Sequence, residues 1–464
     1  MLKEKSYQRH LIMAKSDHII KEILNEGYSD LDFKTSSTKE ICLETQIENE
    51  FEALSLENPY SNLKSSSSNV EATAKLYMDF YFLTDCETKD FIRSNLVMFI
   101  MRGLPGSGKS TIVRNIREVF GAGDSNNFEI CSADHYFIRN DNSYKFDAKK
   151  LKDAHSYCQE IAKHSVKQRK SIIIIDNNNI KRWEMQPYHR MANQGGYLVI
   201  LIEPKTPWRL NPIILTEKNC HNVTNDVLVK KVEEYSSVFP LYYGWFLGRS
   251  ESRKLRYGGK KLLKSIVENC EKFRTDFKEL SSSMSNPNYT DYSLPYNFEY
   301  SKKSCVTNDH SLLHCTSKYC GNLRSGKYDD VLNYSSRADI KDSLGTVSKL
   351  KVSGFVISEK TFSATVALDE KQLQLFERSS YDKGSRAHIT LAITDDASPV
   401  QAGLDTLEVF ELEKKNKNQL KGDYYIYKIP RTTYILKQFR EGLWSVNTSS
   451  KELMFNALFT GYYS

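Results

Sequence analysis

The sequence predicts an α/β domain with a parallel sheet, followed by an α+β domain with a largely antiparallel sheet. Two observations lead to this prediction. Between residues 96 and 202, short apolar runs alternate with amphipathic stretches, as strands and helices do in a sheet covered on both faces. Beyond about residue 350, apolar and polar residues alternate with a period of two, which is typical of strands with one solvated face.

Every expected strand of the first domain is a short apolar run, and an amphipathic helix follows each of the first three. The strands are Leu96–Met101, Phe128–Cys131, Ile172–Ile175 and Leu198–Ile202. The helices are Ser110–Phe120, Ala148–Lys167 and Arg182–Asn193. Strands that alternate with helices in this way imply βαβ units and a parallel sheet.

The second domain combines alternating stretches with two helical patterns. The alternating stretches are Lys351–Ser358, Ser363–Leu368 and Met454–Tyr462, and the helical ones are Glu370–Phe376 and Val400–Lys414. We expect the chain to divide into a weakly ordered extension (residues 1–88), the α/β domain (89–238) and the α+β domain (239–464).

The overall composition excludes some classes of protein without identifying one. The 464 residues are 40% hydrophobic and 12% aromatic, which excludes a wholly disordered chain, and the net charge of +7 is mild for this length. Nine cysteines without a C-x-x-C pair, behind a charged start, indicate reduced thiols and a cytoplasmic protein. No lipid anchor is evident from the sequence.

A glycine-rich motif follows the first expected strand directly. The segment 103–110 reads GLPGSGKS, which matches G-x-x-x-x-G-K-[ST], and it opens an amphipathic helix. Such a loop presents backbone N–H groups to phosphates at a helix N-terminus. The candidate nucleotide-binding residues on and beside this loop are Gly103, Gly106, Gly108, Lys109, Ser110, Thr111, Asp134 and Asp176. We therefore expect nucleotide binding, with a glycine-rich turn without a ligand as the alternative.

Two acidic residues and a hydroxyl extend this prediction to a metal ion. Lys109 reaches the β- and γ-phosphates in such motifs, and Ser110 and Asp176 are positioned to hold Mg²⁺ with ATP. Asp134 follows the second expected strand, where a base facing the γ-phosphate would lie. ATP and Mg²⁺ are thus the expected ligands of the first domain.

Two H-x-T motifs lie on apolar, alternating runs of the second domain. They are His314-Cys315-Thr316 and His388-Ile389-Thr390. Residues at i and i+2 of a strand share a face, so two adjacent strands would bring two imidazoles and two hydroxyls together. That set suits a phosphodiester, because one neutral histidine can activate water, a protonated one can protonate the leaving oxygen, and hydroxyls can hold phosphate oxygens.

Two other interpretations of these histidines stay open on the residues alone. A single histidine on an apolar strand is more often a hydrogen-bonded core residue. His314, Cys315 and Cys320 are also metal-ligand types, but their spacing fits no usual zinc pattern and a fourth ligand is not apparent.

Together these motifs resemble the 2′,3′-cyclic-nucleotide 3′-phosphodiesterase family, which joins a P-loop domain of polynucleotide-kinase type to a two-histidine (2H) phosphoesterase domain. The matching strings are MRGLPGSGKS (101–110), EPKTPWRL (203–210), FPLYYGWFL (239–247), LHCTSKYC (313–320), GSRAHITL (384–391) and FTGYY (459–463). They run in family order over roughly four-fifths of the chain.

The resemblance implies hydrolysis of nucleoside 2′,3′-cyclic phosphates, free or at RNA 3′ ends, to 2′-phosphates, with no cofactor required. His314, Thr316, His388 and Thr390 match the family's catalytic positions, with His388 as base and His314 as acid. Tyr319, Arg386 and Tyr242 are the implied substrate-side residues. For each of these three, an ordinary core or surface role is the alternative.

Two further functions remain open. One is RNA end repair, in which the P-loop domain phosphorylates 5′-OH ends. The other is a scaffold that binds RNA or a cytoskeletal partner, suggested by a basic cluster formed by Lys254, Arg256, Lys260, Lys261 and Lys264. Such a charge run is more often a solvated helix face.

Overall fold

The computed structural model describes residues 80–121, 125–139, 143–282, 312–321, 328–377, 386–417, 425–429, 434–448 and 453–463. Residues 1–79, most of the predicted extension, lie outside the described residues. Two short helices, α4 (Tyr81–Thr84) and α5 (Cys86–Arg93), precede the first strand. The described structure therefore begins before residue 89, where we expected the first domain to start.

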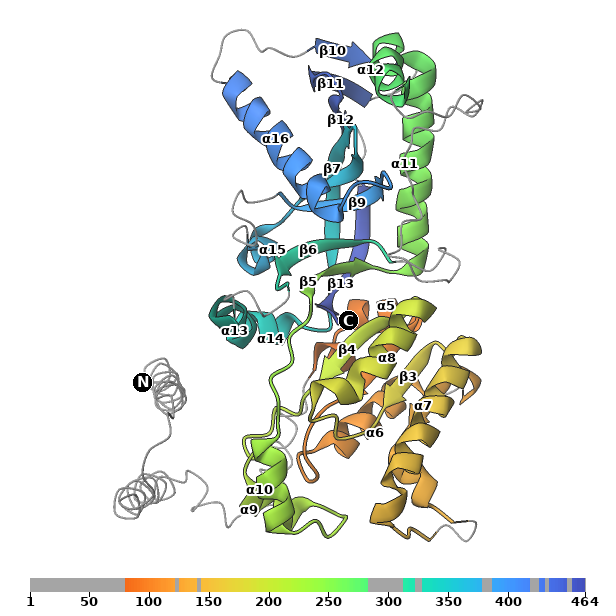
Figure 1. Cartoon of the computed structure of the whole chain (residues 1–464), viewed down its shortest axis with the longest axis vertical. Helices are drawn as coiled ribbons and strands as arrows, with labels where there is room; N and C mark the ends of the chain where they lie inside the picture. Colours follow the sequence, from red (N-terminus) through yellow and green to blue (C-terminus); the bar gives the residue numbers. More distant parts are fainter. Residues whose placement is uncertain are drawn as a thin grey trace, which may run out of the picture. The chain divides into compact units, whose positions relative to one another are not determined.

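The first domain contains a four-stranded parallel sheet in the order β2-β3-β1-β4 (Figure 1). The strands are β1 (Val97–Met101), β2 (Phe128–Cys131), β3 (Ile172–Ile175) and β4 (Leu198–Ile202). Three of these bounds coincide with the predicted runs, and β1 begins one residue later. The parallel sheet of the predicted α/β domain is thus confirmed.

Helices cover both faces of this sheet because its strands are apolar on both sides. They are α6 (Lys109–Phe120), α7 (Leu151–Lys167) and α8 (Arg182–Gly195). Ile172 and Ile174 of β3 belong to the apolar cluster that includes α6, whereas Ile173 and Ile175 pack with α7 and α8. Helices α9 (Pro212–Lys218) and α10 (Asn225–Glu233) follow and lead to the second domain.

The second domain is built on nine strands in the order β10-β11-β12-β7-β13-β5-β6-β9-β8, and every pair is antiparallel. Strand β8 also pairs with β7, so the strands from β7 round to β8 close on themselves like a barrel. The strands are β5 (Tyr242–Leu247), β6 (His314–Tyr319), β7 (Thr346–Ser358), β8 (Thr361–Ala367), β9 (His388–Ile393), β10 (Tyr425–Lys428), β11 (Tyr434–Arg440), β12 (Leu443–Thr448) and β13 (Leu453–Tyr462). The predicted antiparallel sheet is confirmed.

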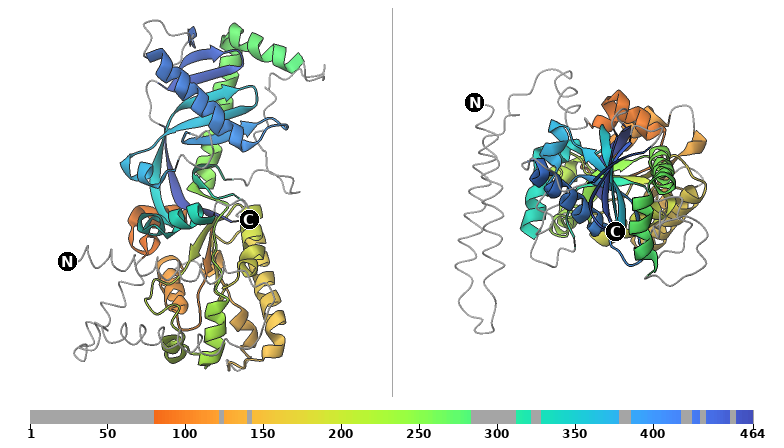
Figure 2. Two further views of the ribbon diagram at one scale, coloured as in Figure 1. Left: turned by 60° about the vertical axis from the view of Figure 1, so that its left-hand side comes forward. Right: turned by 90° about the horizontal axis from the view of Figure 1, so that it is seen from above.

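Two long helices lie against this sheet, as the views in Figure 2 show. Helix α11 (Arg249–Asn269), followed by α12 (Glu271–Ser282), packs its apolar side on the large core that contains Trp245 and Trp444. Helix α16 (Pro399–Lys417) contacts β7, β8, β9 and β12. The smaller helices are α13 (Tyr328–Ser336), α14 (Ala338–Ser343) and α15 (Glu370–Leu375).

The two sheets meet through β13 and β4. The Thr460 hydroxyl donates to the Val199 carbonyl oxygen at 2.6 Å, and Phe246 and Leu458 belong to the same apolar cluster as Phe99. The core of the first domain therefore continues onto one face of β5 and β13. None of the helices among the described residues is both long and apolar enough to cross a bilayer.

Candidate functional site

The two H-x-T motifs lie on neighbouring strands, β6 and β9. Cys315 lies opposite Ile389 in this antiparallel pair, and both of these side chains are fully buried on the α11 side. The residues on either side of them consequently share the other face of the sheet. These residues, all half-buried, form the histidine–threonine quartet: His314, Thr316, His388 and Thr390.

Each of the two imidazoles bonds to the backbone of the residue two positions earlier. The Nδ1 atom of His388 lies 2.7 Å from the Arg386 carbonyl oxygen, two residues earlier on the chain. A carbonyl can only accept, so Nδ1 carries the proton and Nε2 of the neutral ring keeps its lone pair. His314 bonds to the backbone of Leu312, again two residues earlier. His388 therefore has Nε2 left over for chemistry, and a backbone contact also holds the His314 ring.

Burial makes both histidines weak bases. It lowers the pKa of His314 from 6.5 to about 4, with smaller contributions in the same direction from His388 and Arg256. Burial also lowers the pKa of His388, although the Asp405 carboxylate on α16 acts in the opposite direction. Both rings are therefore neutral at pH 7 before an anion binds.

Aromatic rings from β5 hold the His314 ring in place. The Tyr242 ring is stacked on it with centroids 4.7 Å apart, and the Phe246 ring lies 5.2 Å away. Tyr242 in turn stacks on Tyr462 of β13 at 5.0 Å. Tyr242 thus lies beside the quartet, and Phe246 is a contact that the sequence did not indicate.

An irregularity in β6 brings Tyr319 to the quartet's face of the sheet. Thr316 pairs with Gly244, but the next pair joins Lys318 to Tyr243, so Ser317 is an additional residue. A bulge of this kind shifts the alternation of the side chains that follow. Tyr319 consequently pairs with Tyr242 on the face that carries His314.

Arg386 precedes His388 by two residues and therefore shares its face. Its guanidinium carbon lies 3.2 Å from the centroid of the Phe410 ring on α16. A guanidinium stacked on a ring in this way is held by cation–π attraction and keeps a fixed orientation. The structure thus brings all seven candidate phosphodiesterase residues together around β5, β6 and β9.

The glycine-rich loop lies at the carboxyl end of β1, before α6. Gly106 and Gly108 have φ angles of 81° and 105°, which side-chain-bearing residues rarely adopt. A Cβ atom on Gly106 would also lie 2.8 Å from the Leu215 carbonyl oxygen of α9. The loop therefore requires glycine here both for its conformation and for the close approach of α9.

Lys109 and two carboxylates meet at this loop. The buried Lys109 ammonium donates to the Leu104 carbonyl oxygen and to Asn178 Oδ1, both at 3.0 Å. Burial lowers its pKa to about 8, while the nearby Asp176 and Asp134 oppose that effect. Burial also raises the pKa of Asp176. Ser110 and Thr111 begin α6 beside Lys109, with Ser110 exposed.

Asp134 stands in a short 3-10 turn, Ala133–Phe137, after β2. Its carboxylate accepts from the Tyr144 hydroxyl at 3.2 Å, and His221 Nε2 lies 3.9 Å from its other oxygen. Burial and Asp134 together raise the pKa of Tyr144 to about 12, so this phenol remains a hydrogen-bond donor. Tyr144 and His221 are partners of Asp134 that the sequence did not indicate.

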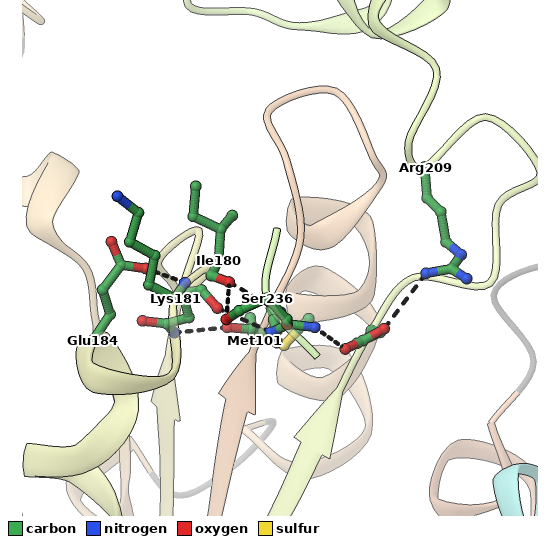
Figure 3. A network of polar contacts seen from close by, with 9 residues as sticks. Met101, Ile180, Lys181, Glu184, Arg209 and Ser236 are labelled. Carbon is green, nitrogen blue, oxygen red and sulfur yellow. Dashed lines mark hydrogen bonds and ion pairs between the residues drawn. The ribbon is translucent and has the colours of Figure 1, made fainter. Parts of the chain in front are cut away.

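A polar network surrounds Arg102, the residue just before the glycine-rich loop, and includes Ser236, which lies between α10 and β5 (Figure 3). The buried Arg102 guanidinium donates to the carbonyl oxygens of Ile180 and Asn179, at 3.0 and 3.1 Å, and to that of Ser236. It also pairs with Glu203, whose other oxygen lies 3.5 Å from Arg209. Glu203 thus links Arg102 to Arg209.

The described residues contain no group of three or more histidine, cysteine or acidic side chains arranged to hold a metal ion. The cysteines among them are all free, and Cys315 points to the core rather than to the quartet. Nothing in this part of the chain supports the metal-site interpretation of His314, Cys315 and Cys320.

Comparison with known proteins adds the evolutionary context. Residues 239–464 match the family model described as 2′,3′-cyclic nucleotide 3′-phosphodiesterase, and residues 98–232 match an AAA domain model. The 2′,3′-cyclic-nucleotide 3′-phosphodiesterases of Rattus norvegicus and Mus musculus are each 33% identical to the chain, over 86% of it and 90% of their own length. NEDD4-binding protein 2 of Homo sapiens is 39% identical over 30% of the chain and 8% of its own length.

Proposed function

Because the chain belongs to the 2′,3′-cyclic-nucleotide 3′-phosphodiesterase family, we propose that its quartet hydrolyses nucleoside 2′,3′-cyclic phosphates to 2′-phosphates, on free nucleotides and at RNA 3′ ends. The observation that carries this proposal is the Cys315–Ile389 pairing, which sets two imidazoles and two hydroxyls on one face of the sheet.

In the proposed mechanism His388 is the base. With Nδ1–H donated to the Arg386 carbonyl, Nε2 is free to take a proton from water as the water oxygen bonds to phosphorus. The bond between phosphorus and O3′ breaks, and a protonated His314 gives its proton to O3′. The phosphate stays on O2′, so atoms and charge balance without a metal or a redox partner.

The remaining residues act on the phosphate and on the rings. The hydroxyls of Thr316 and Thr390 donate to the non-bridging oxygens, which gain negative charge as water attacks. Arg386 adds a fixed positive charge, and Tyr319 offers a ring for the nucleoside. Because His314 is weakly basic in the empty site, the bound phosphate anion is what raises its pKa enough to hold the proton.

The test is turnover of 2′,3′-cyclic NADP by the full chain and by His314→Ala and His388→Ala, with His189→Phe as the control for a buried histidine outside the quartet. Loss of an acid or base costs about 10²–10⁴-fold in rate. Both quartet variants should lose activity to this extent, and the control should retain it. Chromatography should show only the 2′-phosphate, and EDTA should have no effect. Near-normal turnover in either quartet variant would exclude the mechanism.

A second candidate function is phosphoryl transfer from ATP to a 5′-hydroxyl end of RNA. It is favoured by the meeting of Lys109, Asp176 and Asp134 at the glycine-rich loop. The loop fits phosphates, because its positive-φ glycines leave room for them and the Ser107 hydroxyl is buried without a hydrogen-bond partner. Ser110 and Asp176 would hold Mg²⁺, which neutralises phosphate charge when bound.

In this reaction the acceptor oxygen bonds to the γ-phosphorus, and its proton passes to the Asp134 carboxylate. The bond to the β-phosphate oxygen breaks, and its electron pair leaves with ADP. The test is transfer of label from γ-labelled ATP to RNA with a 5′-OH end. Lys109→Ala and Asp134→Ala should abolish transfer and His388→Ala should retain it. Absence of transfer by the pure, folded chain would remove this candidate.

A further inference from the structure

Exposed aromatic rings gather next to Asp134, on a part of the first domain that neither candidate reaction has used. Phe146 is 53% exposed and Tyr144 43%, Tyr157 is 40% exposed and Tyr136 37%. Large rings are normally covered in a folded protein, and a contiguous exposed group marks a binding surface more often than chance exposure does. We call these four residues the ring surface.

The rings form one connected series rather than scattered side chains. Tyr157 lies 5.8 Å from Tyr136 between centroids, and Tyr136 lies 5.5 Å from the buried Phe137. Phe137 in turn lies 5.1 Å from Phe146 and 6.1 Å from Tyr144. Phe137 is thus the fixed centre from which the exposed rings extend.

The backbone holds the ring surface in place. Ile138 and Tyr144 form an isolated antiparallel bridge, and the Lys145 N–H donates to the Phe137 carbonyl oxygen at 3.0 Å. The 3-10 turn that carries Tyr136 packs along α7, which carries Tyr157. The rings are therefore presented in a set arrangement, which lowers the entropic cost of binding to them.

Lysines lie in the same stretch of the chain as the rings. Exposed side chains at Lys145, Lys149, Lys150 and Lys152 follow one another between Tyr144 and Tyr157. Within the described residues these four ammonium groups make no ion pair, and Asp147 uses its carboxylate to cap the backbone N–H of Lys149. Positive charge close in the chain to exposed rings is the combination that binds single-stranded nucleic acid, with bases on the rings and phosphates at the cations.

Tyr144 connects the ring surface to the candidate kinase site. Its hydroxyl bonds to Asp134 at 3.2 Å, while its ring belongs to the exposed series and lies 5.6 Å from the His221 ring. A strand whose terminal base stacks at this end has its terminal hydroxyl beside Asp134.

We propose that the ring surface and its lysines bind single-stranded RNA or DNA, and that they deliver its 5′-hydroxyl end to Asp134. The role in delivery rests on the second candidate function above, whereas binding of the strand does not. Sequence preference is expected to be weak, because every base has a face that can stack.

The experiment measures fluorescence anisotropy of a short single-stranded RNA that has a 5′-OH end, a 3′-linked dye and no cyclic phosphate, titrated with the full chain. Tyr136→Ala and Phe146→Ala should each weaken binding by about 5- to 100-fold. The triple change of Lys149, Lys150 and Lys152 to Ala should reduce the slope of log affinity against log salt by about 2. Tyr425→Ala and Lys428→Ala, on the exposed strand β10, are the matched controls and should bind normally.

All variants should keep cyclic-phosphate hydrolysis, which reports that they are folded. Photo-crosslinking of a bromouridine-containing strand should label the 133–157 peptide. Equal affinity of the ring variants and the unchanged chain, or crosslinks confined to α11, would overturn the proposed surface. If ring variants lose binding but the unchanged chain transfers no label from ATP, the surface is supported and delivery to Asp134 is rejected.

Discussion

The pH dependence of cyclic-phosphate hydrolysis tests the buried environment of the quartet. In the proposed mechanism, the reactive form has one protonated and one neutral imidazole. At pH values above the pKa of both histidines, the fraction of chains in this singly protonated form rises about tenfold for each unit by which the pH falls. This holds whichever of the two rings carries the proton. Burial lowers the pKa of both His314 and His388 below the usual 6.5. The fraction of the reactive form should therefore keep rising below pH 6.5, whereas with two histidines of ordinary pKa it would level off near that pH.

We expect kcat/KM to increase by up to about tenfold between pH 6.5 and about 5.5. The measurement is kcat/KM at constant ionic strength with 2′,3′-cyclic NADP well below saturation, since this quantity reports the free enzyme. Arg256→Gln removes a positive charge that lowers the pKa of His314, so it should move the pH profile to higher pH. A maximum at or above pH 6.5 would refute the reasoning.

Three further predictions concern stability. Gly258→Ala should raise the free energy of unfolding by about 0.5–1 kcal/mol, because the new Cβ meets nothing within 4 Å. Gly259→Ala brings a Cβ within 3.0–3.1 Å of buried side chains of β8 and β9. In urea unfolding, the free energy of unfolding of Gly259→Ala should be at least about 1 kcal/mol below that of Gly258→Ala. Equal gains for both would contradict the packing of α11. Burial lowers the pKa of His189 from 6.5 to about 4, so its contribution to stability is present above pH 6.5 and is lost as the pH falls towards 4. His189→Phe keeps a ring stacked on Tyr463 and should remove up to about 3 kcal/mol of the stability that the chain loses between pH 6.5 and 4. If the stability of this variant depends on pH as that of the unchanged chain does, His189 is not buried. Thr460→Val leaves the Val199 carbonyl without its donor and should cost about 1–2 kcal/mol in thermal unfolding, while an unaltered midpoint would argue against this contact.

The parallel sheet was predictable almost to the residue, and the antiparallel sheet was not. Strands β1 and β3 are buried on both sides, so they read as continuous apolar runs such as Ile172–Ile175. Strand β7 begins at Thr346, five residues before the predicted start, because its first residues are polar and partly exposed. Strands β10 to β12 were not among the strands expected, and β10 is mostly exposed. Edge strands of this kind carry little apolar signal.

The pairing of the two H-x-T motifs followed from strand periodicity, but their surroundings did not. Phe246, Arg256, Asp405 and Phe410 act on the quartet or on Arg386 from β5, α11 and α16. Each is an ordinary strand or helix residue in the sequence, and only the register of the sheet and the packing of the helices bring it near. Tyr319 depends on the additional residue Ser317, which no hydrophobic pattern reveals.

The position of β13 within its sheet has a consequence for how the chain is made. β5, the strand nearest the start of the second domain, pairs with β13, which contains residues 453–462, and β7 pairs with β13 on its other side. During synthesis the first sheet has all its strands once residue 202 has left the ribosome. The edges of β5 and β7 that pair with β13 stay unpaired for longer, because 205 and 94 residues, respectively, separate the ends of these strands from the start of β13. We therefore expect the parallel sheet to form first during translation, and the antiparallel sheet to form only when β13, a strand near its centre, arrives.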